Sequence, residues 1–141
     1  MVPPANISWD DTMIYVPPIT VGRVIKVYDG DTFTLACCLN GDSTLERYYR
    51  FSVRLAGIDT PEMKSRNATE KSLATAAQTA LSRLILNQVV ELRNVKFEKY
   101  GRLLADVYVG NIHVNQYMID NKHAVYYDGG TKPEWTTDVV D

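Results

Sequence analysis

The chain of 141 residues has few of the side chains that bind soft metals or cross-link secreted proteins. It contains two cysteines and two histidines, and none of them shows the spacing of a zinc site. Cys37 and Cys38 are adjacent, so in a strand their side chains point to opposite faces. We interpret them as two small apolar residues in a reducing compartment, with a vicinal disulfide or a metal site as the alternative.

Long apolar runs and a basic excess are also missing. No apolar run is long enough to span a membrane, and the first residues lack the pattern of a secretory signal, so we expect an intracellular protein. The 15 basic and 17 acidic residues give a net charge of −2, which excludes the capture of polyanions by a strong overall field. Residues 1–127 hold 14 basic and 13 acidic groups and can still bind phosphate locally.

The sequence does contain a succession of strand and helix patterns of a length typical of one domain. Strands are expected in the alternating or β-branched segments 21–28, 31–39, 48–58, 89–97 and 102–109. Apolar residues at helical spacing predict a helix from Asn67 to Asn87, and a short helix is expected at 114–122. A hairpin turn is expected at 40–43.

Five strands, with one helix between the third and fourth and a short helix after the fifth, predict an α+β, mainly β, fold. This is the pattern of a five-stranded OB-fold barrel, in which closure protects the strand edges. Two proline pairs in residues 1–18 favour an extended N-terminal arm and exclude a helix there. We therefore predict an arm at 1–18, the barrel domain at 19–127 and a loose acidic tail at 128–141.

Several acidic residues occur at positions where a turn or a helix cap would each explain the presence of an acid. Asp31 follows the Asp29-Gly30 turn signal and begins a strand, where acids are disfavoured. Asp59 and Glu62 lie on either side of Thr60-Pro61, an arrangement that alone would be interpreted as helix capping. The carboxylates of Asp31 and Asp59 and the Thr60 carbonyl are, however, hard oxygen ligands suited to Ca²⁺ or Mg²⁺.

Two arginines complete a possible catalytic set. Arg54 lies in an otherwise apolar or small segment, where solvent exposure and pairing with a counter-charge or phosphate are equally favoured. Arg102 follows a glycine turn, where ordinary surface charge is the alternative. Hydrolysis of a phosphodiester needs a cation, a base and donors for the developing charge. Glu62 can act as the base and the two arginines as donors, so the combination predicts a metal-dependent phosphodiesterase.

Three motifs also resemble the signature blocks of the staphylococcal nuclease (thermonuclease) family. They are Asp29-Gly30-Asp31-Thr32, the segment 54–62 and Lys99-Tyr100-Gly101-Arg102, in the same order and with the same internal spacing. The resemblance extends from about Val21 to about Ala124. It implies an SNase-like barrel that cleaves DNA and RNA with Ca²⁺.

The resemblance further implies one Ca²⁺ ion, bound by the carboxylates of Asp31 and Asp59 and by the Thr60 carbonyl. The implied partners are DNA, RNA or both, without a membrane. We expect a monomer that prefers single-stranded or frayed substrate, because the barrel groove suits splayed strands. The choice between endonuclease and exonuclease action stays open.

Catalytic and substrate-binding roles are implied as well. Glu62 would be the general base or would position the attacking water. Arg54 and Arg102 would hold the phosphate and stabilise the transition state. Lys99 and Tyr100 match family positions that contact a neighbouring phosphate.

The sequence also departs from the familiar members of this family. Tyr126 and Tyr127 lie near the base-stacking tyrosines of the best-known member, but the register does not match cleanly, so no role is assigned to them. Residues 123–130 resemble intracellular or viral versions. The near-neutral charge predicts weak standing affinity for polymer. A non-catalytic module that binds nucleic acid or protein on the same barrel is the alternative function, and a structural calcium site is a third.

Overall fold

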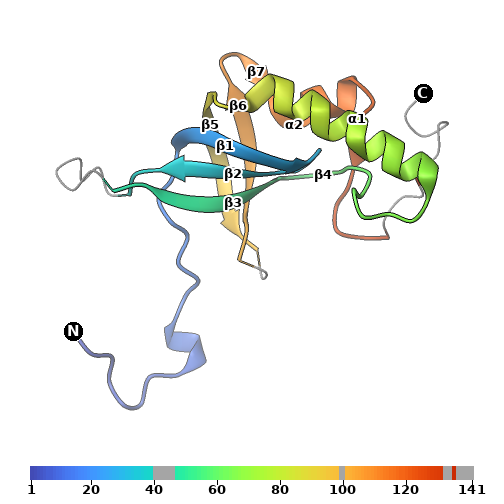
Figure 1. Cartoon of the computed structure of the whole chain (residues 1–141). Coiled ribbons are helices and arrows are strands. Elements are labelled where there is room, and N and C mark those ends of the chain that lie inside the picture. The colour runs from blue at the N-terminus through green and yellow to red at the C-terminus, as the bar shows by residue number, and fades with distance from the viewer. Residues whose placement is uncertain (40–46, 99–100, 132–134, 136–141) are drawn as a thin grey trace.

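The computed structural model describes residues 1–39, 47–98, 101–131 and 135 (Figure 1). The hairpin turn expected at 40–43 lies outside the described residues. The same holds for Lys99 and Tyr100, the residues predicted to contact substrate.

Five long strands form the barrel. They are β1 (Val21–Asp29), β2 (Thr32–Cys37), β3 (Tyr49–Leu55), β5 (Val89–Phe97) and β6 (Leu103–Val109). They follow the order β3-β2-β1-β5-β6 with antiparallel neighbours, and a parallel pairing of β3 with β6 closes the sheet. The predicted OB-fold barrel of the α+β class is therefore confirmed.

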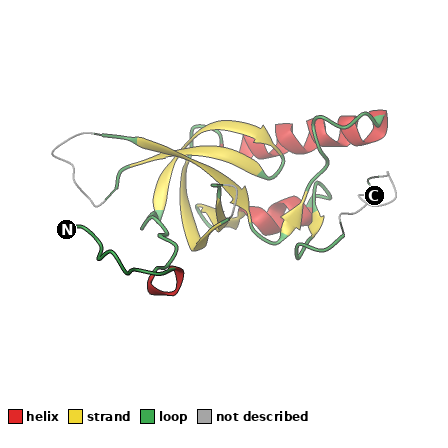
Figure 2. Ribbon diagram, turned by 90° about the horizontal axis from the view of Figure 1, so that it is seen from below, coloured by secondary structure: helices red, strands yellow, loops and turns green. Residues whose placement is uncertain are grey.

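Both predicted helices are present. α1 (Ala68–Ile85) lies between β3 and β5, and α2 (Val114–Asp120) follows β6. The Asn67 side chain caps α1 by accepting a hydrogen bond from the Glu70 N–H, as the sequence predicted. Figures 1 and 2 show the two helices gathered at one end of the barrel. In the described part of the chain, no helix is long and apolar enough to cross a membrane.

The barrel interior is one apolar core. Phe33 of β2 pairs with Val27 of β1 and with Val53 of β3, and all three side chains are buried. Because side chains alternate across a strand, the residues between them point to the outer surface of the barrel. Burial of each large apolar side chain contributes about 1.5–3 kcal/mol to folding.

The predicted C-terminal boundary of the third strand, 48–58, is wrong. β3 stops at Leu55 because the chain turns at Gly57, whose φ of +77° favours glycine. Ile58–Asp59 then forms a separate short strand, β4, which pairs with β8 (Val125–Tyr126). A further short strand, β7 (Ile112–His113), extends β6 as a hairpin. The other long strands differ from their predicted bounds by at most two residues at either end.

Two expectations about the ends of the chain also need correction. The arm contains a single 3₁₀ turn, Trp9–Asp11, which is capped by Ser8 although the proline pairs were expected to exclude a helix. The prolines leave room for it because they lie outside the turn. In the segment predicted to be a loose tail, Trp135 is buried.

Candidate active site

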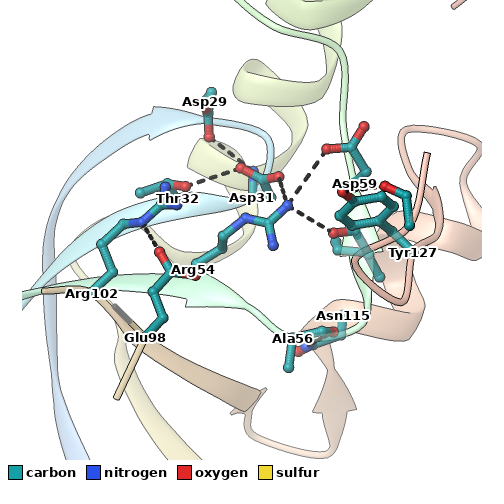
Figure 3. A network of polar contacts seen from close by, with 12 residues as sticks. Asp29, Asp31, Thr32, Arg54, Ala56, Asp59, Glu98, Arg102, Asn115 and Tyr127 are labelled. Atoms are coloured by element: carbon teal, nitrogen blue, oxygen red, sulfur yellow. Dashed lines mark hydrogen bonds and ion pairs between the residues drawn. The ribbon is translucent and has the colours of Figure 1, made fainter. Parts of the chain in front are cut away.

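One cavity collects the residues that the sequence marked as catalytic or metal-binding. It has a volume of about 370 Å³, and its walls combine acids, arginines and one tyrosine. They are Asp29, Asp31, Arg54, Asp59, Thr60, Glu62, Glu98, Arg102 and Tyr127. All six predicted catalytic and metal-binding residues are thus brought together; Figure 3 shows four of them with their polar contacts. Two larger hollows of about 570 and 530 Å³ lie beside residues 16–23 and contain none of these groups.

The turn between β1 and β2 places Asp31 in this cavity. The Asp31 N–H donates to the Asp29 carboxylate at 3.1 Å, and the Thr32 hydroxyl donates to the Asp31 carboxylate at 3.0 Å. Gly30 allows α1 to approach the turn, since a Cβ on Gly30 would lie 2.7 Å from the Ala77 Cβ. Asp31 is consequently 6% exposed and held in one orientation.

Arg54 projects from the outer surface of β3 between two carboxylates (Figure 3). Its Nη2 atom lies 3.4 Å from Asp31 Oδ2 and 3.5 Å from Asp59 Oδ1, and it donates to the Ile58 carbonyl at 3.3 Å. The side chain is 14% exposed. Of the two environments that the sequence left open for Arg54, the structure therefore shows pairing with counter-charges.

The loop from Asp59 to Glu62 is held at both ends. The pairing of β4 with β8 positions Asp59, which is buried together with Thr60. At the other end, the backbone N–H of Glu62 donates to the Glu70 carboxylate at 3.0 Å. The Ser65 hydroxyl donates to the same carboxylate at 2.9 Å. The first turn of α1 thereby anchors the loop, while the Glu62 side chain is exposed toward the cavity.

Arg102 enters the cavity from the turn between β5 and β6. Its Nε donates to a carboxylate oxygen of Glu98, and the Glu98 N–H donates to the Arg102 carbonyl at 2.8 Å. Gly101, whose φ of +86° favours glycine, donates its N–H to the Glu98 carbonyl at 3.0 Å. Each arginine of the cavity is therefore paired with acids of its own.

The charges of the cavity do not balance. Its described walls carry five acids and two arginines, a formal excess of three negative charges when all are ionised. Burial raises the pKa of Asp29 to about 7, and the hydrogen bond and negative charge of Asp31 add to that rise. A phosphate group would meet strong repulsion here without an added cation.

The donor set fits a hard divalent cation. Among the described residues, no three acid, histidine or cysteine side chains form a metal-binding cluster, and Arg54 stands between Asp31 and Asp59. The available donors are nevertheless carboxylate and carbonyl oxygens, as Ca²⁺ prefers. The excess negative charge would be relieved by such an ion.

Three residues of the cavity were not assigned by sequence reasoning. Asp29 was interpreted only as part of a turn signal, and Glu98 and Tyr127 were given no role. Tyr127 lies with its ring centroid 5.9 Å from the Arg54 guanidinium carbon, whereas Tyr126 is 71% exposed. The sequence feature that could have identified Glu98 as a cavity residue is its position directly before the Lys99-Tyr100-Gly101-Arg102 motif.

The sequence of the chain is similar to those of known proteins. The family model described as "Staphylococcal nuclease homologue" matches residues 52–138. A Haemophilus influenzae protein named "Uncharacterized endonuclease" is 36% identical over 105 residues, which cover 74% of this chain and 51% of that protein. An Oryza sativa protein named "Probable staphylococcal-like nuclease CAN2" is 33% identical over 86 residues, or 61% of this chain and 21% of the rice protein. The chain thus spans about half or less of the length of these relatives.

Proposed function

Since the chain belongs to the staphylococcal nuclease homologue family, we propose that it is a Ca²⁺-dependent nuclease that hydrolyses phosphodiester bonds of DNA and RNA. The observation that carries the proposal is the single cavity that holds Arg54 and Arg102 together with Asp31, Asp59 and Glu62. The names of two relatives, an uncharacterized endonuclease and a probable staphylococcal-like nuclease, support the same chemistry.

The proposed metal ligands are the carboxylates of Asp31 and Asp59 and the carbonyl oxygen of Thr60. When bound, a divalent cation supplies positive charge that offsets the negative charge of the phosphate. All three residues are buried, and the carboxylates of Asp31 and Asp59 both pair with Arg54.

The arginines and Glu62 perform the remaining steps in this proposal. Arg54 and Arg102 exchange their carboxylate partners for phosphate oxygens and donate hydrogen bonds as charge develops there. Glu62 accepts a proton from the water that attacks phosphorus, or positions that water. The P–O bond to the leaving strand breaks as the new bond forms, and the leaving oxygen takes a proton from solvent. Lys99 and Tyr100 are proposed to contact a neighbouring phosphate, and single-stranded or frayed substrate is proposed to be preferred.

Digestion of single-stranded DNA and RNA in Ca²⁺, in Mg²⁺ and in chelator tests the proposal. We expect cleavage with Ca²⁺ and none with chelator, and near-complete loss of turnover in Asp31→Ala. Circular single-stranded DNA distinguishes endonuclease from exonuclease action. Folded protein that binds nucleic acid but shows no metal-dependent cleavage would instead be the non-catalytic module.

A further inference from the structure

We propose that the N-terminal arm, residues 1–18, docks in an apolar hollow on a second copy of this chain, so that two copies exchange their arms. The inference does not depend on the proposed nuclease function, because the hollow holds none of the residues of the catalytic cavity. Figure 1 shows the arm running away from the barrel. Within the described residues, no hydrogen bond or ion pair joins residues 1–16 to the barrel.

The arm carries large apolar side chains that its own copy leaves in solvent. Trp9 and Met13 are 89% and 91% exposed, and Ile14 and Tyr15 beside them are also exposed. Single exposed apolar residues are ordinary on a protein surface, whereas a group of them marks a place where another molecule binds. The arm therefore has the composition of a docking segment.

The turn around Trp9 is held by hydrogen bonds of its own. The Ser8 N–H and hydroxyl both donate to the Asp11 carboxylate, at 3.0 and 3.1 Å. The Thr12 hydroxyl donates to the Trp9 carbonyl at 2.7 Å. Because these contacts lie within the turn, Trp9 is presented outward without support from the barrel. Tryptophan is a frequent anchor of protein interfaces, and an anchor ordered beforehand loses less entropy on docking.

An apolar hollow lies where the arm joins β1. Its volume of about 570 Å³ falls within the range of roughly 300–1,000 Å³ of sites that bury a small molecule, so it has room for an indole. Its walls include the buried side chains of Ile19 and Cys37 and the exposed side chains of Val21, Tyr48 and Val89. This lining is suited to the apolar ring of a tryptophan.

The charges of the arm and the hollow are complementary. Asp10 and Asp11 follow Trp9, and residues 1–18 contain no basic side chain. Among the described walls of the hollow, Arg23 is the sole charged residue, and no ion pair of Arg23 is found within the described residues. The acidic arm would be attracted to this hollow and repelled by the phosphates of nucleic acid or of anionic lipid. A protein surface is therefore the favoured partner of the arm.

The base of the arm favours a second copy over the arm's own hollow. Pro17 and Pro18 each fix their φ, and the Ile19 N–H donates to the Pro17 carbonyl at 2.8 Å. These constraints restrict the direction in which the arm leaves the barrel, and Trp9 lies outside its own hollow. Two copies that exchange identical arms fill both hollows at once.

The area available is sufficient for a stable pair. Trp9 and Tyr15 can each bury about 150–250 Å². Two arms present four such side chains, and with the surfaces that they cover they exceed the roughly 1,000 Å² that a specific interface needs. Arm exchange therefore predicts a dimer, in place of the monomer that the sequence led us to expect.

Sedimentation equilibrium of the whole chain at several protein concentrations tests the exchange. Trp9→Ala removes the anchor of the arm, and Tyr48→Asp places an acid at the hollow, where it repels the acidic arm. Both positions are exposed and lie outside the long strands, and circular dichroism verifies the fold. Tyr126→Asp is the matched control, because Tyr126 has a similar exposure to Tyr48 and does not line the hollow.

We expect the parent to form a dimer, and the dissociation constant to rise by at least about tenfold in Trp9→Ala and in Tyr48→Asp. Tyr126→Asp should retain the parental value. A mixture of the two variants should associate more strongly than either alone, because the intact arm of Tyr48→Asp meets the intact hollow of Trp9→Ala. The proposal is overturned if the parent stays monomeric, if Trp9→Ala dimerises like the parent, if Tyr126→Asp weakens the dimer equally, or if mixing restores nothing.

Discussion

Arg54 contacts both acids that are proposed to bind the metal ion. Its guanidinium is shared between Asp31 and Asp59, the proposed metal ligands, and it is also a proposed donor to phosphate. The same positive charge therefore opposes a metal ion before substrate arrives and stabilises the phosphate afterwards. The two effects can be separated experimentally because one concerns cation binding and the other concerns turnover.

Replacement of Arg54 by alanine should change metal binding and catalysis in opposite directions. We expect Arg54→Ala to bind Ca²⁺ more tightly, on the order of tenfold, because a positive charge beside the two carboxylates is removed. Cleavage should fall by roughly 10²–10³ through loss of a phosphate donor. Isothermal titration calorimetry and digestion rates measure the two quantities. Weaker Ca²⁺ binding in the variant would contradict the inference that the positive charge of Arg54 opposes binding of the metal ion. Arg93→Ala, which breaks the pair with Glu91 on β5, is the control.

Glu62 permits a cleaner test of proton transfer, because its side chain is exposed. We expect Glu62→Gln to lower kcat by about 10²–10⁴ and to leave the melting temperature unchanged. Steady-state kinetics and thermal unfolding provide the measurements. Glu91→Gln removes a comparable exposed carboxylate and should retain parental kcat; retained kcat in Glu62→Gln would exclude its role as base.

At the scale of elements, the first turns of the two helices hold the loops of the site. Glu70 in α1 accepts hydrogen bonds from the loop that carries Glu62. Asn115 in α2 is buried. Its side-chain oxygen accepts a hydrogen bond at 2.9 Å from the backbone N–H of Val107 in β6. Its amide donates to the Ala56 carbonyl at 2.9 Å (Figure 3) and to the Ala105 carbonyl at 3.1 Å. α2 is thereby tied to the turn that ends β3 and leads to the acidic loop.

Removal of this amide should destabilise the protein more than loss of an exposed one. We expect Asn115→Ala to lower the free energy of unfolding by roughly 3 kcal/mol, because buried backbone groups lose their partners. Urea unfolding measures the change. Asn121→Ala removes a single exposed hydrogen bond to the Tyr117 carbonyl and should cost less than about 1 kcal/mol. Equal effects of the two substitutions would argue against the bracing role of Asn115.

For the whole molecule, the excess of acids in one cavity links metal binding to stability. An ion that binds only the folded chain stabilises it by about 2.7 kcal/mol when present at roughly 100 times its Kd. We therefore expect Ca²⁺ to raise the melting temperature by several degrees and chelator to reverse the rise. Asp31→Asn should abolish the Ca²⁺-dependent part of this shift. A parental melting temperature that is independent of Ca²⁺ would contradict the proposed metal site.

Local patterns explain how much of the fold was predictable. Strand alternation, helical spacing and the Asn67 cap are properties of neighbouring residues, and the bounds of β1, β5 and α1 agree with them closely. The end of β3 was not predictable in this way. It depends on the positive φ of Gly57 and on the pairing of β4 with β8, which lie more than sixty residues apart in the chain.

By itself, the sequence determined the fold class, the family and most of the residues that line the cavity, because these depend on periodicity and on motif spacing along the chain. Only the tertiary structure decided the environments of those residues. Arg54 lies between Asp31 and Asp59, Arg102 pairs with Glu98, and Tyr127 joins the cavity from the far end of the chain. Such contacts arise from closure of the barrel and packing of its loops, so the balance of charge in the cavity is a property of the folded chain alone.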